Sequence, residues 1–363
     1  MSAPSRRILI TGVATYWGGR LAQALEAFDE FEAIIGVDSR EPTRELERTE
    51  FVKVSNQHSL LQRIVRAAEI DTVIDTRMIV NSVTASPRAA HENNVIGTMN
   101  ILAACTGKDS PVRKFVFKSS THYYGSQQDD PAFFVEPMRR PHPPGSLLER
   151  DIVDAEEAVS DFADKNPEVA VTVLRCANVL GPDVDTNFTR MFSLPVVPMV
   201  FGFDPRLQFV HEDDVVHALE HAAVNRIEGV FNVAADGVLA LSEAISLLGK
   251  RPLPVLPPVG SALFLAPLRR LRLGAPEELT SLLRFGRGVD NRLYKSNGFD
   301  YGYTSRETVI ALGEHLRLQP VMRGREESYR YEREVEEFLR WSRHVRRERP
   351  ADGVAADPEP LGI

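Results

Sequence analysis

Cysteine is scarce in this sequence: only Cys105 and Cys176 occur among 363 residues. Both stand in apolar runs, so we expect two buried free thiols in a reducing cytoplasm rather than a disulfide. Long apolar runs are absent as well, because none reaches the ~18 residues that a membrane-spanning helix needs. The first residues, MSAPSRRILITG, lead directly into an expected strand and leave no room for a signal peptide. These absences predict a cytoplasmic protein without a transmembrane segment.

Positive charge is also in short supply. Lysine and arginine number 43 against 51 aspartate and glutamate residues, which gives a formal net charge of −8. A protein that holds the phosphates of nucleic acid needs a basic surface, so we expect no nucleic-acid partner. Otherwise the composition is ordinary, because 43% of the residues are hydrophobic and 26% are charged. These values are typical of a globular protein of one large or two moderate domains.

Short β-branched runs alternate with amphipathic helical stretches in the N-terminal part of the chain. The strand-like runs lie at 7–11, 33–38, 51–54, 72–75 and 114–118, with a further one at 169–174. Such alternation is typical of repeated βαβ units, in which a parallel sheet carries helices on both faces. The sequence therefore predicts an α/β fold with a Rossmann-type doubly wound parallel sheet.

The later segments indicate a smaller C-terminal lobe that is interleaved with the sheet domain. They are rich in Pro, Gly and Leu, while the C-terminal region becomes densely charged with apolar residues at helical spacing. The expected parts are a nucleotide-binding domain of residues 1–182 and 208–235, a substrate-side lobe of residues 183–207 and 236–318, a charged surface helix at 323–348 and a disordered tail at 349–363.

The stretch TGVATYWGG near the N-terminus has the context of a dinucleotide-binding loop, because it follows a strand-like run and opens a helical one. Gly12 permits a tight turn, and Gly18 permits close packing of the helix on the strand. Thr15 replaces the usual middle glycine and offers a hydroxyl in place of a close backbone approach. The N–H groups that begin the helix, those of Tyr16 and Trp17 among them, present a positive dipole end to a pyrophosphate.

Asp38 closes the second strand-like run, twenty residues after Gly18. A carboxylate at this place accepts hydrogen bonds from the adenosine ribose and repels a 2′-phosphate. We therefore expect NAD as the cofactor, with NADP as the weaker alternative because Arg40 is nearby. No metal site is expected.

Several further motifs stand in order along the chain. They are NNVIGTMNIL from Asn93, FKSSTHYYGS from Phe117, LRCANVLGP from Leu174, FVHEDDVV from Phe209 and FNVAADG from Phe231. Together with the loop, they resemble the extended short-chain dehydrogenase/reductases. Among these the chain is most similar to the NAD-dependent epimerase/dehydratase family, whose best-known member is UDP-glucose 4-epimerase. The resemblance covers about residues 6–315.

This resemblance implies an activity and a set of site residues. Members of the family transfer a hydride between a sugar carbon and nicotinamide, and a tyrosine with a lysine four residues later moves the proton. By the same resemblance, Ser120 would hold the substrate hydroxyl and Asn94 would brace the sheet beside the cofactor. Asn178 would touch a small-molecule substrate such as a nucleotide-linked sugar. A homodimer through the helices around 90–105 and 148–164 is also implied.

The proton-transfer dyad of the family is missing from this chain. When Glu156 is aligned with the acid that follows the family's lysine, Leu148 takes the tyrosine position and Ile152 the lysine position. None of the eight tyrosines has a lysine four residues later, so no shift of register restores the pair. The side chains that could replace it are His122, Tyr123, Glu149 and Asp151. Tyr124 is a weaker candidate, because the resemblance implies a structural role for a tyrosine at its position.

The border of the expected cofactor site departs from the family in other places. Arg77 and Met78 stand where small alanines usually follow the fourth strand, and Ser55 replaces an acid that borders the adenine. An arginine there either pairs with a phosphate or occupies space that the dinucleotide needs. These substitutions predict an altered or weakened use of the cofactor.

Three functions remain open on the sequence. The first is an atypical epimerase or dehydratase that acts on a nucleotide-linked sugar through Ser120 and a non-standard acid/base. The second is a catalytically inactive NAD-binding protein that senses the dinucleotide or scaffolds a partner. The third binds no dinucleotide and contacts another protein through the charged C-terminal helix. The apolar stretch 255–273 is expected to pack in the C-terminal lobe, with peripheral membrane contact as the alternative.

Overall fold

The computed structural model describes residues 7–54, 57–81, 85–255, 277–322 and 335. Its centre is a sheet of seven parallel strands in the order β3-β2-β1-β4-β5-β6-β11. The strands are β1 (Arg7–Thr11), β2 (Ala33–Asp38), β3 (Thr49–Lys53), β4 (Thr72–Asp75), β5 (Lys114–Ser120), β6 (Ala170–Cys176) and β11 (Gly229–Val233). The strand order reverses between β1 and β4, the place at which doubly wound sheets bind their ligands.

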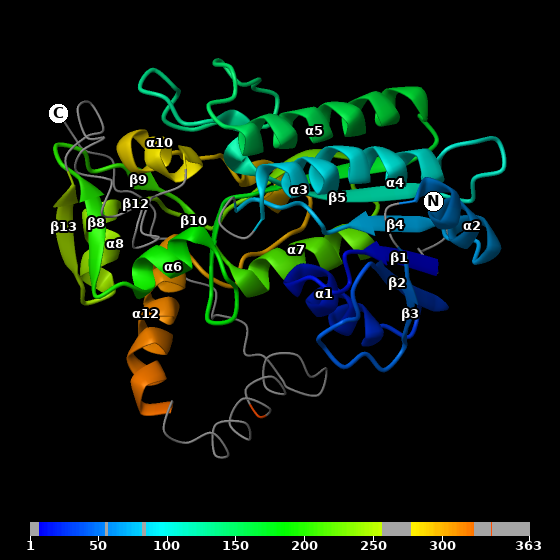
Figure 1. The fold of residues 1–363 in the computed structure, drawn as a ribbon, viewed down its shortest axis with the longest axis horizontal. Helices are drawn as coiled ribbons and strands as arrows, with labels where there is room; N and C mark the ends of the chain where they lie inside the picture. The colour runs from blue at the N-terminus through cyan, green and yellow to red at the C-terminus, as the bar shows by residue number, and fades with distance from the viewer. Residues whose placement is uncertain (1–6, 55–56, 82–84, 256–276, 323–334, 336–363) are drawn as a thin grey trace, which may run out of the picture. The chain divides into compact units, whose positions relative to one another are not determined.

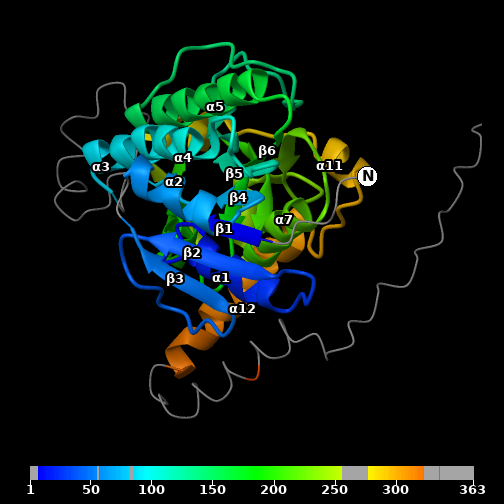
Figure 2. The ribbon, with the colours of Figure 1, turned by 90° about the vertical axis from the view of Figure 1, so that its right-hand side faces the viewer.

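Helices cover both faces of this sheet (Figure 1, Figure 2). One face carries α1 (Tyr16–Glu26) and α7 (Glu212–Val224), and the other carries α2 (His58–Ala67), α4 (Gly97–Cys105) and α5 (Leu147–Lys165). The short helix α3 (Pro87–His91) and the π-helical turn η1 (Glu92–Ile96) lead into α4. The predicted Rossmann-type doubly wound fold is confirmed.

Each face of the sheet has its own hydrophobic cluster, because the strands are apolar on both sides. In β1, Ile8 and Ile10 belong to the cluster with α1 and α7, while Leu9 belongs to the cluster with α2, α4 and α5. Interior strands of a parallel sheet are buried on both faces, which explains continuous apolar runs such as RILIT.

Three two-stranded sheets form apart from the central sheet. They pair β7 (Asn178–Leu180) with β10 (Phe209–His211), β9 (Arg206–Leu207) with β12 (Leu239–Ala240), and β8 (Val196–Val200) with β13 (Arg251–Val255). The accompanying helices are α6 (Asn187–Ser193), α8 (Leu241–Leu247), α10 (Glu277–Phe285) and α12 (Ser305–Met322). The helix α11 (Arg292–Ser296) instead packs on β11, where Tyr294 contacts Phe231. A third hydrophobic cluster joins several of these elements, and Figure 1 shows β8, β13 and α8 at its left end, away from β1 to β4. The exact domain boundaries stay a prediction.

Some expectations fall outside the described residues. They concern the apolar stretch 255–273 beyond its first residue, the charged segment 323–348 apart from Val335, the tail 349–363, and Ser55. In the part of the chain that is described, no helix combines the length and the hydropathy needed to cross a membrane.

Candidate active site

The loop between β1 and α1 turns sharply at Gly12, whose φ is +83°. Other residues rarely adopt this backbone conformation, so the turn requires glycine. Gly18 lets α1 approach the loop, because a Cβ on Gly18 would lie 2.2 Å from the Gly12 carbonyl oxygen. The two glycines therefore shape the turn and the packing of α1 as the motif predicts.

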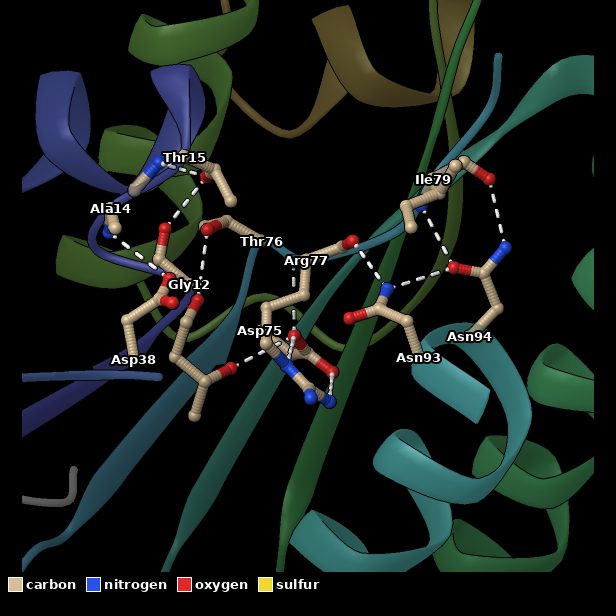
Figure 3. A network of polar contacts seen from close by, with 12 residues as sticks. Gly12, Ala14, Thr15, Asp38, Asp75, Thr76, Arg77, Ile79, Asn93 and Asn94 are labelled. Atoms are coloured by element: carbon tan, nitrogen blue, oxygen red, sulfur yellow. Dashed lines mark hydrogen bonds and ion pairs between the residues drawn. The ribbon is translucent and has the colours of Figure 1, made fainter. Parts of the chain in front are cut away.

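Thr15 caps α1 instead of offering its hydroxyl to a ligand (Figure 3). Its Oγ1 donates to the Gly12 carbonyl oxygen at 2.6 Å and accepts from the Gly18 N–H at 3.1 Å. The single proton of this hydroxyl is thus used within the loop, and a contact of Thr15 with the cofactor stays a prediction. Within the described residues, the N–H groups of Tyr16 and Trp17 have no acceptor. Two donors at the positive end of α1 are thus free for an anion.

Asp38 lies at the end of β2, directly beside this loop. One carboxylate oxygen accepts the N–H of Ala14 at 3.2 Å, and the other accepts the N–H of Arg40 at 3.1 Å. These bonds hold the carboxylate next to the loop, as recognition of an adenosine ribose requires. Arg40 itself is exposed.

Arg77 lies against the loop but is held by its own strand. Its guanidinium forms an ion pair with Asp75, 3.0 Å from Nε and 3.2 Å from Nη2. Asp75 also accepts the Thr11 hydroxyl at 2.8 Å, which fixes the carboxylate at the sheet edge. The stem of Arg77 covers Gly12, since its Cγ lies 2.4 Å from where a Cβ on that glycine would be. Met78 is buried in the cluster with α4 and α5, so it does not fill the loop.

Two asparagines of η1 fix the chain that follows β4 (Figure 3). The Oδ1 of Asn94 accepts the Ile79 N–H at 2.8 Å, and its Nδ2 donates to the Ile79 carbonyl oxygen at 2.8 Å. Asn93 donates from Nδ2 to the carbonyl oxygen of Arg77 at 2.8 Å. Both ends of the buried Asn94 amide are used internally, so Asn94 braces the sheet edge as the resemblance implies. A direct contact of Asn94 with the cofactor stays a prediction.

The carboxyl end of β5 carries a serine–histidine pair. Ser120 precedes the 3-10 turn η2 (Thr121–Tyr124), and its Oγ lies 2.8 Å from Nδ1 of His122. Burial and the cationic side chains of Arg287 and Arg140 hold the pKa of His122 well below its usual 6.5. The imidazole is therefore neutral at about pH 7, and its Nδ1 can accept the proton of the Ser120 hydroxyl. Two residues predicted for catalysis thus lie in contact.

The face of α5 on which the family carries its dyad is part of the core in this chain. Leu148 is 5% exposed and Ile152 is 0% exposed, and both pack in the cluster between α5 and the sheet. Neither position is open to a ligand.

The two carboxylates considered as replacement bases are engaged elsewhere. Glu149 accepts hydrogen bonds from Arg140 and from the N–H of Gly145. Asp151 lies 2.8 Å from Nδ1 of His91 on α3. Glu149 thus holds the chain before α5, and Asp151 holds α3 against α5.

Comparison with known proteins finds a family model and a relative that match most of the chain. Residues 8–234, more than half of the chain, match the model of the NAD dependent epimerase/dehydratase family. The chain belongs to this family. An uncharacterized protein of Mycobacterium tuberculosis is 35% identical to it over 326 residues, which are 87% of this chain and 85% of that protein.

Solved structures of several enzymes share the fold of this epimerase/dehydratase family member. UDP-glucose 4-epimerase of Thermotoga maritima with UDP-glucose has a TM-score of 0.65 at 22% identity, and the match covers 86% of this chain and 99% of the epimerase. dTDP-glucose 4,6-dehydratase of Bacillus anthracis in complex with NAD has a TM-score of 0.65 at 18% identity, with 89% and 98% covered. At these identities the likeness establishes the fold and not the substrate.

The two tyrosines of η2 have structural contacts in this family member. The Arg175 guanidinium lies 3.6 Å from the centroid of the Tyr123 ring and donates to the Tyr124 hydroxyl at 2.8 Å. Glu156 accepts from Arg175 at 2.9 and 2.6 Å, which completes a buried ion pair. Burial raises the pKa of Tyr124 to about 12, and its hydroxyl donates to Asn232. The Tyr123 ring packs on this network, and a part of its hydroxyl in proton transfer stays a prediction.

Asn178, the predicted substrate contact, begins β7 and is buried. Its Nδ2 donates to the carbonyl oxygen of Gln208 at 2.9 Å. The amide nitrogen thus ties β7 to the chain before β10. A substrate contact stays a prediction that involves the amide oxygen alone.

Two cationic side chains were not predicted from the sequence. Arg287 is 7% exposed, and its Nη1 donates to the Gly125 carbonyl oxygen at 3.0 Å, while Nη2 has no partner in the described chain. Lys118 is buried on β5, two residues before Ser120. For Lys118 there was a visible signal, because this lysine ends the strand-like run KFVFK. No local pattern in the sequence marks Arg287.

Proposed function

We propose that this protein binds NAD at the β1–α1 loop and acts on a nucleotide-linked sugar through transient hydride transfer, with Ser120 and His122 as its proton-transfer pair. The observation that carries the proposal is the 2.8 Å contact between Ser120 Oγ and His122 Nδ1. The pair stands at the carboxyl end of β5, the edge of the sheet at which doubly wound folds bind their ligands. We expect the protein to act in the cytoplasm.

The residues at the loop fit an adenine dinucleotide. The free N–H groups of Tyr16 and Trp17 would donate to its pyrophosphate, and Asp38 would accept from the adenosine ribose. The Arg77 guanidinium is bound to Asp75, so it does not cover these donors. The related Bacillus anthracis dehydratase holds NAD, and the negative charge of Asp38 favours NAD over NADP.

When bound, NAD would accept a hydride from a carbon of the sugar. The hydroxyl on that carbon must lose a proton at the same time, and Ser120 can receive this proton while its own passes to Nδ1 of the neutral His122. When the hydride returns, the proton returns by the same route, and both residues end unchanged. The low pKa of His122 favours this return, because the imidazolium form gives up its proton readily.

The substrate is expected to carry negative charge near this pair. Arg287 influences the pKa of His122 through its charge and has an unpaired, buried Nη2. A phosphate or carboxylate oxygen would satisfy this donor with a charge-assisted hydrogen bond. Nucleotide-linked sugars carry such groups, and the related Thermotoga maritima epimerase holds UDP-glucose.

A catalytically inactive NAD-binding protein is the second candidate function. One observation favours it: Leu148 and Ile152 close the face of α5 on which the family carries its dyad. Such a protein would sense the dinucleotide or scaffold a partner, and it would show no turnover.

Turnover separates the two candidates. NAD-loaded protein is mixed with UDP-glucose or with UDP-glucuronic acid, and the absorbance of reduced nicotinamide is followed. We expect the wild type to reduce NAD, and we expect the rate of this reduction to be about 10²- to 10⁴-fold lower in Ser120→Ala and in His122→Gln. The affinity for NAD should not change in either variant. His221→Gln, on α7, is the matched control and should keep wild-type activity. If the protein binds NAD but neither sugar nucleotide reduces it, the enzymatic function is rejected. The inactive NAD-binding function then remains.

We also propose that the protein forms a homodimer through α4 and α5. Ile96 and Met99 expose 44% and 48% of their surface. A shallow groove beside them, between α4 and α5, is lined in part by Val95, Leu102 and Phe162. Large apolar side chains that remain exposed beside such a groove favour contact with the same surface of a second copy.

A further inference from the structure

Lys118 on β5 is a buried cation without a counter-charge. Its side chain belongs to a residue that is 2% exposed. Within the described chain the ammonium group has no hydrogen bond and no carboxylate partner, and its contact is the ring of Trp17, whose centroid lies 4.8 Å from Nζ. The thiol of Cys176 is the titratable group that acts on it electrostatically. Because a lysine is almost never fully buried unless it is paired, this residue calls for an explanation.

The register of the sheet places Lys118 level with the β1–α1 loop. Thr11 of β1, Asp75 of β4 and Phe117 of β5 stand in one row across the strands. Lys118 follows Phe117 and so stands one residue nearer the carboxyl edge, as Thr76 does after Asp75. Thr76 donates from Oγ1 to the carbonyl oxygen of Thr11 at 2.9 Å, directly below the loop.

Lys118 faces the side of the sheet on which α1 lies. Side chains alternate along a strand, and Val116, two residues earlier, belongs to the cluster with α1 and α7. The contact with Trp17, in the first turn of α1, agrees with this direction. Lys118 therefore lies beneath the helix end whose N–H groups are free.

We propose that Lys118 provides the positive charge that the pyrophosphate of the bound dinucleotide requires, and so compensates for Thr15 in place of the middle glycine. This inference rests on the proposed binding of NAD. Arg77, which also lies at this edge of the sheet, is already paired with Asp75, while the ammonium group of Lys118 keeps its donors within the described residues. A phosphate oxygen would give Lys118 the counter-charge that the chain does not supply.

Lys114 on the same strand is a matched control. It is also buried, and burial lowers its pKa to about 8, as burial lowers the pKa of Lys118. Its Nζ donates to the carbonyl oxygens of Ala223 and Asn225 at 2.9 and 2.6 Å. These two hydrogen bonds explain why Lys114 is buried at the opposite end of β5. No described contact explains the burial of Lys118 in the same way.

The test compares Lys118→Met and Lys114→Met with the wild type by calorimetric titration with NAD and with ADP, and by thermal unfolding without ligand. We expect Lys118→Met to bind both ligands about 10- to 100-fold more weakly. Its Tm should rise, because an unpaired buried charge is removed. Lys114→Met should keep the wild-type affinity and lose Tm, because two buried carbonyl groups lose their donor.

Each other outcome overturns the inference. If Lys118→Met binds NAD as tightly as the wild type, Lys118 has no role in binding, while the proposed function stands. If affinity and Tm both fall, Lys118 is part of the scaffold. If the wild type binds neither NAD nor ADP, the proposed function fails together with the inference. Lys118→Gln replaces Lys118→Met if the methionine variant does not fold.

Discussion

His122 is neutral because burial, Arg287 and Arg140 all act against its protonation. The charge of Arg140 is offset by Glu149, with which it pairs. Arg287, by contrast, forms no ion pair in the described part of the chain and donates to the carbonyl oxygen of Gly125. At the scale of single residues, Arg287 is therefore the cation whose removal should raise the pKa of His122 most.

Replacing Arg287 with methionine is expected to raise the pKa of His122 toward its usual 6.5, because a nearby positive charge disappears. An NMR titration of the histidine ring protons measures this change. His221 serves as an internal reference, since the cation that acts on it is Lys114. An unchanged pKa of His122 in Arg287→Met would mean that burial and Arg140 keep the ring neutral without Arg287.

Glu212 at the start of α7 is a second buried residue with a displaced pKa. Burial, Asp183 and Asp213 raise this pKa from 4.5 to about 7, although the carboxylate accepts the N–H of Val184 at 2.7 Å. Arg20 opposes the shift and pairs with Asp213 at 3.1 Å. The folded state therefore favours the protonated carboxyl. Its contribution to stability is complete below pH 4.5 and is lost as the pH rises through about 7.

Glu212→Gln removes this pH dependence and keeps a neutral acceptor for the Val184 N–H. We expect the variant and the wild type to be about equally stable near pH 4.5, and the variant to be more stable above pH 7. The gain should be roughly 3 kcal/mol, since each pKa unit corresponds to about 1.4 kcal/mol. Urea unfolding at the two pH values measures the difference. The same difference at both values would refute the assignment.

The helix α5 carries an apolar stripe where its family carries an acid/base pair. Leu148, Ile152, Ala155, Val159 and Phe162 recur at helical spacing and pack against the sheet. At the scale of the element, this stripe decides what the two substituted positions do. Leu148 and Ile152 stabilise the core, so replacing them should first change the packing and the stability of the protein.

Restoring the dyad with Leu148→Tyr and Ile152→Lys is therefore expected to destabilise the protein rather than to activate it. Ile152 is 0% exposed, and an unpaired lysine at such a position costs about 3 kcal/mol or more. Urea unfolding measures the loss. Asp161→Ala, on the exposed side of α5, is the control and should change stability by less than about 0.5 kcal/mol. A stable, active double variant would show that this face is open after all.

The elements that the sequence predicted are those whose signals are local. The alternating runs and the spacing of Gly12 and Gly18 depend on residues that are close in the chain. The roles of Thr15 and Asp151 were not predictable in this way. Each has a hydrogen-bond partner that the family motif does not specify, and for Asp151 this partner comes from another element.

Over the described chain as a whole, the candidate site draws on segments far apart in sequence. Arg287 follows α10 and reaches the end of β5, where His122 lies. Gly286 makes this approach possible, because its φ is +71° and a Cβ there would lie 2.2 Å from the Arg206 carbonyl oxygen. The meeting of Arg287 with His122 depends on the packing of the C-terminal elements, and no periodicity in the sequence predicts it.

Met99→Lys is expected to convert the proposed dimer to a monomer, because a charge on α4 would be buried between two copies. Size-exclusion chromatography with light scattering measures the mass. Leu253→Lys is the matched control, since Leu253 on β13 is 45% exposed and Met99 is 48% exposed. This control should stay dimeric. A monomeric wild type, or a dimeric Met99→Lys, would contradict the proposed interface.

Calorimetric titration of the wild-type protein with NAD and with NADP tests the central claim most directly. The claim is that the Tyr16 and Trp17 N–H groups and Asp38 still hold an adenine dinucleotide, although Thr15 caps the helix and Arg77 covers Gly12. We expect saturable binding of NAD at one site per chain, and weaker binding of NADP because Asp38 repels its 2′-phosphate. Saturable binding of neither nucleotide would contradict the claim.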